Sequence, residues 1–482
     1  MKPGMKRVVI VGGGITGLSA AYALQEASNA AGEVDYLLIE RDQRLGGKIL
    51  TEKVDGFTIE GGPDCFLSEK PWVAELSRRL GITHRLLCSN EDRKGIFVLS
   101  GGRLHRLPEG IMLMVPTRIL PFALSPLISW PGKLRMALDL VLPKKKGDED
   151  ETLASFVTRR LGREALEKIA GPLIGGIHGS DAEEMSLKAA FPRFLQMEQE
   201  YGSLIRAMLA ARKKAPAPAT GAAGRPKRTY FMSFVDGMGE LTATVGSRLN
   251  PEKVLTGRKA TGIIAGGGAR GKGYTVQVEG MQPVNADAII ITVPANDAAD
   301  LLEGLDRQMA GSLRKIPMAT SATISVAYRR SDVPHPLEGF GFMVPFIENR
   351  KISAVTFSSV KWDYRVPDPE HVLLRTFVGG AHHQELVDLE DDELMGLVRR
   401  ELKDILGIKA APVLAMIHRW VKCRPRYTLG HLERVAAIEE RATIYPGLYL
   451  AGGSYRGIGV PDCINSGTLA ADKALAYLKE LA

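Results

Sequence analysis

Four glycines near the start of the chain have the spacing of a phosphate-binding turn. Gly12, Gly13, Gly14 and Gly17 follow the β-branched run 8–11 and precede an apolar helical pattern. In a strand–turn–helix unit, the first glycine permits the tight turn, the second lets a pyrophosphate approach, and the last lets helix and strand pack closely. The helix N-terminus then offers unpaired N–H groups to the phosphates. We therefore expect a dinucleotide to contact residues 12–17, including Ile15 and Thr16.

An acidic residue ends the second predicted strand. Residues 36–39 are apolar and lead into Glu40, 23 residues after Gly17. A carboxylate at this point accepts hydrogen bonds from ribose hydroxyls and repels a 2′-phosphate. The spacing therefore favours FAD or NAD over NADP.

Two further glycine segments favour FAD over NAD. Gly47 and Lys48 follow the ribose-binding carboxylate, where backbone amides would face the flavin side of the pyrophosphate. Near the C-terminus, Gly453 lies in a turn between a short strand and a helix predicted to start within 461–465. A second helix N-terminus at this place would stabilise negative charge on a reduced isoalloxazine ring.

The order of predicted elements indicates an α/β protein. We expect a Rossmann-like FAD/NAD(P)-binding domain, an inserted α+β substrate domain, and a helical region that can associate with a membrane. The predicted FAD domain is discontinuous and comprises 1–100, 229–295 and 431–482. The helical region is 101–228, with a flexible surface loop at 211–228, and the substrate domain is 296–430.

Within the substrate domain, alternating residues at 323–328, 353–358 and 373–378 predict an antiparallel sheet. An acidic start predicts an amphipathic helix over 391–406.

One segment of the helical region is apolar but broken. Residues 111–142 are rich in Leu, Met, Ile, Trp and Pro, and prolines at 116, 121, 126 and 131 divide them into short pieces. Such pieces are too short to span a bilayer. They would either dip into a headgroup layer with the basic run 144–146 at their rim, or form a buried cap over a ligand cavity.

Composition sets broad limits. The 482 residues carry a formal net charge of +8, and no basic run interleaved with aromatics suggests nucleic-acid binding. The four cysteines lack CxxC spacing, which argues against zinc and for reduced thiols in a cytoplasmic protein. We expect no metal site.

The motifs together resemble one enzyme family. The sequences GGGITGLSAAYAL, EGGPD, PRYTLGH and GVPDCINSG, with FPRFLQMEQEYGSL at 191–204, are similar to those of oxygen-dependent porphyrinogen oxidases. These enzymes belong to the amine-oxidase-like FAD superfamily and act late in haem biosynthesis. The resemblance runs from residue 7 to about 475.

The resemblance implies an FAD enzyme that aromatises a porphyrinogen. A methylene bridge would give hydride to flavin N5, O₂ would reoxidise the flavin to give peroxide, and three rounds would yield the porphyrin. The substrate would be protoporphyrinogen IX or coproporphyrinogen III, and the residues leave this choice open. The family has no agreed general base, so we assign no catalytic side chain.

The resemblance also assigns contacts residue by residue. Beyond the residues above, the cofactor contacts would be Arg41, Gly62, Pro63, Asp64, Cys65, Ala260, Trp420, Ile458, Gly459 and Val460. Gly175, Gly176 and Met343 would line the substrate cavity, and Lys70 or Arg103 would pair with a propionate. Expected partners are the porphyrinogen and O₂, a second copy of the chain in a homodimer, a membrane surface through peripheral contact, and, transiently, the next haem-pathway enzyme.

Two other functions compete with this interpretation. An amine oxidase or a carotenoid desaturase would share the superfamily fold, the former with an aromatic pair facing the flavin. A non-catalytic flavoprotein would keep the dinucleotide fold for structure alone.

Overall fold

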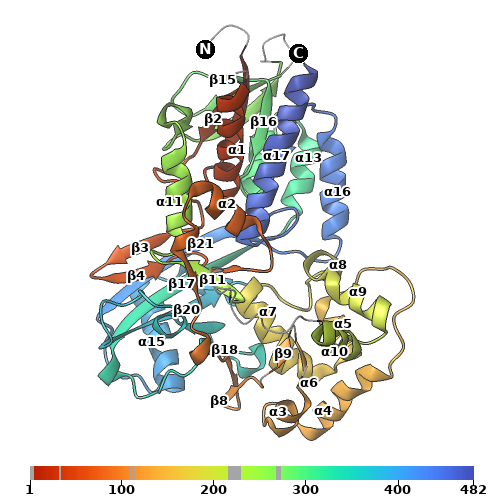
Figure 1. Ribbon diagram of the computed structural model, residues 1–482, viewed down its shortest axis with the longest axis vertical. Helices are drawn as coiled ribbons and strands as arrows, with labels where there is room; N and C mark the ends of the chain where they lie inside the picture. Colours follow the sequence, from red (N-terminus) through yellow and green to blue (C-terminus); the bar gives the residue numbers. More distant parts are fainter. Residues whose placement is uncertain are drawn as a thin grey trace.

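A five-stranded parallel sheet forms the centre of the upper half of the molecule (Figure 1). The computed structural model describes residues 5–31, 34–108, 110–112, 114–116, 118–214, 229–266 and 273–481. Its strand order is β12-β2-β1-β16-β22, and every neighbouring pair is parallel. The strands are β12 (Val254–Leu255), β2 (Val34–Ile39), β1 (Lys6–Val11), β16 (Ala288–Ile291) and β22 (Leu448–Leu450).

The central strand β1 is buried on both faces, as its continuous apolar run predicts. Val8 and Ile10 pack in the core formed with α1 (Ile15–Ala31) and α17 (Val460–Glu480). Val9 and Val11, which point the other way, join the core beneath the small sheet β13-β14-β15. The two-residue period of the strand thus divides the apolar core into two layers.

The remaining elements of this half cover the two faces. On the side of α1 and α17 lie α2 (Trp72–Leu80) and α11 (Gly239–Arg248). The other face is covered by β13 (Ala260–Ala265), β14 (Tyr274–Val278), β15 (Val284–Ala286), α12 (Ala295–Leu302), α13 (Arg307–Arg314) and α16 (His431–Ala442).

A seven-stranded sheet organises the lower half, with the order β21-β17-β20-β19-β18-β7-β8. Its long strands β17, β20 and β21 pair antiparallel, as does β19 with β20, which confirms the antiparallel sheet predicted from alternation. The strands are β7 (Phe97–Ser100), β8 (Arg103–Arg106), β17 (Met318–Arg329), β18 (Gly341–Met343), β19 (Ala354–Phe357), β20 (His371–Gly379) and β21 (Leu414–Pro425). Helix α15 (Asp391–Leu406) has the predicted bounds, and its apolar side chains pack on this sheet.

Strands β7 and β8 show how the chain passes between the halves. Residues 97–100 lie inside the first predicted range of the FAD domain, yet β7 pairs in parallel with β18 of the lower sheet. The chain therefore contributes to the lower sheet before it enters the helical region.

Short helices dominate the next segment, as expected for 101–210. The helices are α3 (Ile119–Leu124), α4 (Trp130–Ala137), η3 (Leu138–Leu140), α5 (Leu153–Arg160), α6 (Arg163–Ala165), η4 (Leu166–Ala170), α7 (Gly171–His178), α8 (Leu187–Ala190), α9 (Pro192–Tyr201) and α10 (Leu204–Lys214). Helix α4 continues directly into η3, and α6, η4 and α7 follow one another without a break. The first four residues of the predicted loop 211–228 are helical, because Ala, Arg and Lys there continue α10. The rest of that loop, 215–228, lies outside the described residues.

Smaller strands complete the fold. Alternating residues around 54–59 predict a hairpin, which β3 (Thr51–Val54) and β4 (Phe57–Glu60) form; Asp55 and Gly56, which both have positive φ, join the two strands. Other short strands are β5 (Phe66–Leu67), β6 (Leu86–Cys88), β9 (Ile111–Met112), β10 (Val115–Pro116) and β11 (Phe231–Phe234), with 3-10 turns at Thr83–Arg85, Glu91–Arg93, Pro251–Lys253, Arg330–Asp332, Phe346–Glu348 and Gln384–Asp388. A four-residue helix, α14 (Ser358–Lys361), follows β19.

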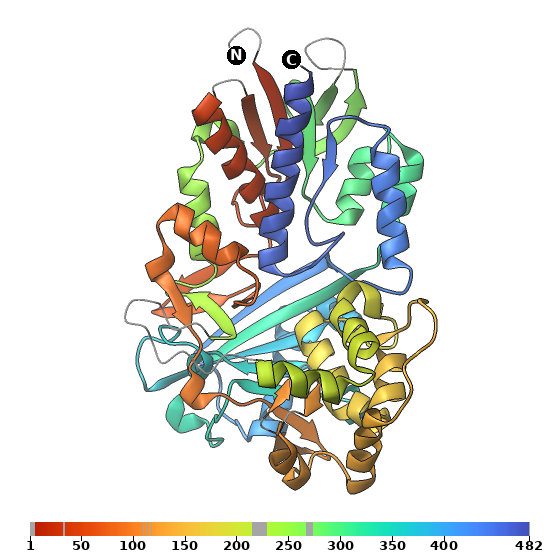
Figure 2. The same cartoon turned by 45° about the vertical axis from the view of Figure 1, so that its right-hand side comes forward.

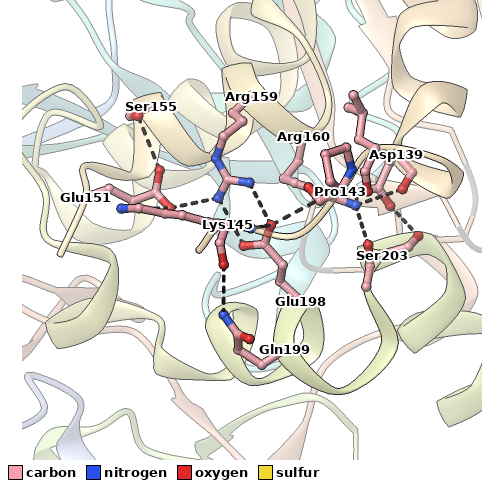
Figure 3. A network of polar contacts seen from close by, with 12 residues as sticks. Asp139, Pro143, Lys145, Glu151, Ser155, Arg159, Arg160, Glu198, Gln199 and Ser203 are labelled. Atoms are coloured by element: carbon pink, nitrogen blue, oxygen red, sulfur yellow. Dashed lines mark hydrogen bonds and ion pairs between the residues drawn. The ribbon is translucent and has the colours of Figure 1, made fainter. Parts of the chain in front are cut away.

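A buried ion network holds the helical region together (Figure 3). The Arg160 guanidinium donates to the Asp139 carboxylate with Nε–Oδ1 2.6 Å, and neither side chain is exposed. Ser203 donates to the other oxygen of Asp139, and Arg159 bridges Glu198 and Glu151. The network joins the end of α4–η3 to α5, α9 and the start of α10. Breaking a buried pair by removing one partner costs about 3–5 kcal/mol, so loss of either Asp139 or Arg160 would destabilise the contact between these helices.

The packing of Gly17 yields a stability test. A Cβ on Gly17 would lie 1.9 Å from the carbonyl oxygen of Gly12, so Gly17→Ala must push α1 away from β1. We expect at least about 2 kcal/mol of destabilisation and loss of bound dinucleotide. Gly311→Ala in α13 is the matched control, because nothing lies within 4 Å of its added Cβ. That helical substitution should be neutral or stabilising. Thermal unfolding of Gly17→Ala, Gly311→Ala and the wild type tests this expectation. Equal melting temperatures for the two variants would contradict the close packing at Gly17.

The buried carboxyl of Glu60 yields a pH test. Burial raises the pKa of Glu60 to about 7, although Thr51, Arg365 and the Met238 N–H oppose the shift. Because the folded state keeps this proton where the unfolded chain has lost it, stability from this group is full below pH 4.5 and falls as pH rises through 7. The unfolding free energy of the wild type should fall by roughly 3 kcal/mol relative to Glu60→Gln between pH 5 and 8. Glu370→Gln, on an exposed turn, serves as the control. If the unfolding free energies of the wild type and Glu60→Gln changed in parallel with pH, the expectation would be refuted.

Candidate functional site

The first glycine turn lies at the carboxyl end of β1, beside the strands on either side. Gly12 N donates to the Ile39 carbonyl oxygen at 2.8 Å, and Thr292 Oγ1 donates to the Gly12 carbonyl oxygen at 2.9 Å. Helix α1 begins at Ile15, so the N–H groups of Ile15 and Thr16 lie in its first turn and have no partner within the helix. This is the edge of a parallel sheet where ligands of such folds bind.

The second glycine pair lies directly against the first. Gly46 N donates to the Gly13 carbonyl oxygen at 2.8 Å, and Gly14 forms an isolated parallel bridge with Gly46. A Cβ on Gly14 would meet no protein atom closer than the Cα of Gly47, at 4.0 Å. The space in front of Gly14 is therefore open, as a bound pyrophosphate requires.

Glu40 is buried beside this turn. Its Oε2 accepts a hydrogen bond from Gly13 N, and its Oε1 accepts from Asp42 N at 2.8 Å. Arg41 is exposed and pairs with Asp297 at 3.3 Å. Ala260 opens β13, where it pairs with Val278. The Glu40 carboxylate, which is predicted to accept from the ribose, is thus oriented by Gly13 of the turn that is predicted to bind the phosphates.

A third turn, 61–65, adjoins the second glycine pair. A Cβ on Gly62 would lie 1.7 Å from the Lys48 carbonyl oxygen, so the two backbones are in contact. Trp420 Nε1 in β21 donates to the Gly61 carbonyl oxygen at 2.9 Å. Lys48 itself donates through Nζ to the Cys423 carbonyl oxygen. Trp420 thus lies at the turn predicted to contact the flavin.

Asp64 in this turn is held by side chains from the lower sheet. Its Oδ2 accepts from Lys361 Nζ at 2.8 Å and from Trp362 Nε1 at 3.0 Å. Burial alone would raise the pKa of Asp64, but Lys361 and Arg375 outweigh it and hold that pKa well below its usual range. The neighbouring Cys65 thiol stays protonated, since burial raises its pKa to about 12.

The C-terminal turn 452–459 completes the arrangement. Gly452 N donates to Ser466 Oγ at 2.9 Å, and a Cβ on Gly452 would come within 3.4 Å of Thr16 Oγ1. Both ends of the chain therefore meet at one place, as Figure 2 shows for α1 and α17. Ile458 and Gly459 precede Val460, the first residue of α17, and all three are partly exposed.

Two side chains of the YTLGH motif support the C-terminal turn. Tyr427 Oη donates to the Gly453 carbonyl oxygen at 2.7 Å, and a ring nitrogen of His431 lies 2.9 Å from the Tyr455 carbonyl oxygen. The two rings stack with centroids 3.9 Å apart. The motif that carries the family resemblance therefore holds the turn predicted to run beneath the flavin.

The predicted substrate residues lie on separate elements. Gly175 and Gly176 are in α7, which packs against β18, and an added Cβ on Gly175 would meet nothing within 4 Å. Met343 in β18 is buried. Lys70 is bonded to Asp462 in the first turn of α17, with Nζ–Oδ1 2.6 Å. Arg103 lies exposed on β8, away from these contacts.

Sequence reasoning did not single out Lys361, Trp362 or Arg375 as site residues. Lys361 is 297 positions from Asp64 in the chain, and no local motif marks it. The only usable signal was that two charged residues lie in or beside otherwise apolar strand patterns of the lower sheet.

Within the described ranges, no group of three or more His, Cys, Asp or Glu side chains is arranged to hold a metal ion. None of the four cysteines, all of which lie within the described residues, is joined in a disulfide.

Comparison with known proteins identifies the family. The family model for flavin-containing amine oxidoreductases matches residues 15–475. A coproporphyrinogen III oxidase of Bacillus subtilis is 35% identical over 480 residues, which cover 99% of this chain and 100% of that protein. Protoporphyrinogen oxidase 2 of Arabidopsis thaliana is 27% identical, covering 98% of this chain and 94% of that protein.

A solved structure supports the same family assignment. A crystal structure from Exiguobacterium, described as a candidate protoporphyrinogen oxidase, matches with a TM-score of 0.84 and 32% identity, covering 99% of this chain and 100% of that one.

The residues present fit a flavin dinucleotide. The open space at Gly14, the N-termini of α1 and α17, and the oriented Glu40 carboxylate supply the contacts that the pyrophosphate, ring and ribose need. With the family pattern matched over nearly the whole chain, this protein belongs to the flavin-containing amine oxidoreductases, and its cofactor is FAD.

Proposed function

We propose that the protein oxidises coproporphyrinogen III to the porphyrin in haem biosynthesis, with O₂ as the final acceptor. The observation that carries the proposal is the 35% identity, over both full lengths, to the coproporphyrinogen III oxidase of Bacillus subtilis. The match to a plant protoporphyrinogen oxidase is weaker, at 27%. Protoporphyrinogen IX is therefore the second candidate substrate.

Bound FAD supplies a hydride acceptor that O₂ can reoxidise with release of peroxide. The chain's part is to bind and orient. In this proposal residues 12–17, Gly47, Lys48 and Glu40 hold the pyrophosphate and ribose. Residues 62–65, Trp420, Gly453 and 458–460 surround the ring, and Ala260 offers backbone groups to the adenine. The N-terminus of α17 favours negative charge that develops on the ring.

We place the substrate beside α7 and β18, on the side where Gly175 is open. Gly175 leaves room for a flat macrocycle, Gly176 stays a predicted contact, and Met343 adds an apolar contact. Lys70 is already paired with Asp462, so it can bind a propionate only if it shares or breaks this ion pair. In this proposal the ion pair also secures the start of α17. The product is aromatic and the oxidation runs downhill, which explains why no strong base is assigned.

We further propose that the protein contacts an anionic membrane surface as a peripheral protein. Seven large apolar side chains are exposed on α3, α4, η3 and the residue that follows η3. They are Leu120, Leu124, Trp130, Leu134, Leu138, Leu140 and Val141, and we call them the apolar patch. Leu124 is 75% and Leu134 68% exposed. An open groove runs between Pro131, Leu134 and Val141. Isolated exposed leucines are ordinary, but a continuous set marks an interaction surface.

Basic groups border the apolar patch. Lys133 lies over the Trp130 ring, with Nζ 4.6 Å from its centroid, and the run 144–146 follows directly. This pairing of apolar side chains with lysines suits the headgroup region of an anionic bilayer. Within the described part of the chain, none of the helices combines the length and apolar character that crossing a bilayer requires. Cytoplasmic placement, a homodimer and a transient contact with the next haem-pathway enzyme stay predictions.

The substrate assignment is tested with the purified, FAD-loaded protein under air. Coproporphyrinogen III should give porphyrin fluorescence and peroxide with at least a tenfold higher kcat/KM than protoporphyrinogen IX. A primary amine should give no peroxide. A yellow protein that oxidises the amine but neither porphyrinogen would refute the proposal.

The membrane assignment is tested by co-sedimentation with phosphatidylglycerol vesicles, with phosphatidylcholine vesicles as the neutral comparison. The double variant Leu124→Glu/Leu134→Glu should lower binding more than tenfold, because each buried leucine contributes about 1.5–3 kcal/mol. Ile444→Glu/Leu469→Glu, at exposed apolar sites elsewhere, is the matched control and should bind like the wild type. Equal binding by both double variants would exclude the apolar patch as the contact.

A further inference from the structure

Four buried ionisable side chains gather around the partly buried Asp64 of the turn 61–65. Lys361, Arg365 and Arg375 come from α14, the following loop and β20, and are 7%, 1% and 4% exposed. The carboxyls are Glu60 at the end of β4, which is 5% exposed, and Asp64 in the turn itself. We call this set the charge cluster.

Contacts tie the charge cluster to the backbone of the turn. Lys361 pairs with Asp64 at 2.8 Å, and Arg375 lies 3.8 Å from the other oxygen of that carboxylate. Arg375 also donates to the Gly62 carbonyl oxygen, while its Nε has no hydrogen-bond partner among the described residues. Arg365 is held by the carbonyl oxygens of Val235 and Phe234.

The charges in the charge cluster do not balance. Three cations face one ionised carboxylate, because the pKa of Glu60 is raised to about 7 and this group is largely protonated below neutral pH. Asp236 and Asp363 also act on Arg365, but they lie near the surface, where water screens them. Unbalanced charge in a low-dielectric interior is costly, and a nearby negative group relieves it.

The charge cluster faces the FAD site through a short chain of contacts. The turn touches the Lys48 backbone at Gly62, and the adjacent Gly47 touches Gly14. Reduction of FAD by two electrons and one proton leaves one more negative charge on the cofactor than in its oxidised form. Positive charge behind the turn would therefore favour the reduced form over the oxidised form.

We propose that Asp64, Lys361 and Arg375 set the reduction potential of the bound FAD, the two cations raising it and the carboxylate lowering it. This extends the role of the turn from holding the cofactor to tuning its electron affinity. It rests on the binding of FAD beside the turn and not on which substrate is oxidised.

The test is the midpoint potential of the flavin in the holoenzyme, titrated with a reference dye in the absence of any porphyrinogen. Lys361→Met should shift the equilibrium tenfold or more toward oxidised flavin, which for a two-electron couple lowers the potential by about 30 mV. Asp64→Asn should shift it the opposite way. Lys361→Arg, which keeps the charge, should stay near the wild type. Lys403→Met, on the exposed face of α15, removes one lysine far from the turn and should change nothing.

Opposite shifts for the two neutralising variants would support the proposal, because simple loosening of the turn would move both potentials the same way. Shifts of the same sign, or none, would overturn it. FAD content and thermal unfolding are measured alongside. If Lys361→Met does not fold, Asp64→Asn with a raised potential still supports the proposal, and an unchanged or lowered one overturns it. A holoenzyme that oxidises neither porphyrinogen would refute the proposed function and leave these potentials readable.

Discussion

The site depends on backbones that approach one another without side chains between them. Gly17 lets α1 lie against the carbonyl oxygen of Gly12, and an added Cβ on Gly467 would stand 2.1 Å from the Thr16 carbonyl oxygen. One short stretch of α1 thus contacts both β1 and α17. The two helix N-termini that we propose face the cofactor are fixed relative to each other by these contacts, so the proposed geometry for phosphate and ring has a common origin.

Much of the fold could be predicted from sequence where its signals are local. The run 8–11, the glycines after it and Glu40 lie within one βαβ unit, and the structure forms that unit with β1 and β2 paired in register. The hairpin at Asp55 and Gly56 and the helix over 391–406 follow from turn chemistry and from period. The family and cofactor followed from the same motifs.

The partners of Asp64 were not predictable in this way. Lys361 and Arg375 reach the turn only because the lower sheet folds back against it, and their positions carry no spacing rule. For Lys70, the residue type was informative but its tertiary partner could not be predicted. Its type suited a propionate, yet its nearest acceptor is Asp462, a residue 392 positions away. Local patterns identify groups that can do chemistry, whereas tertiary packing decides which group each one meets.

The closing position of α17 has a consequence for biosynthesis. The glycine turn at residues 12–17 leaves the ribosome long before α17, which packs against α1 and starts only at Val460. At typical rates of translation, α1 waits about half a minute before α17 has been made and can pack against it. During that interval α1 lacks the cover that α17 later gives it, although α2 and α11 of the same core are made earlier. The proposed FAD site, which includes the N-termini of both helices, is therefore complete only once α17 has been made and has packed against α1.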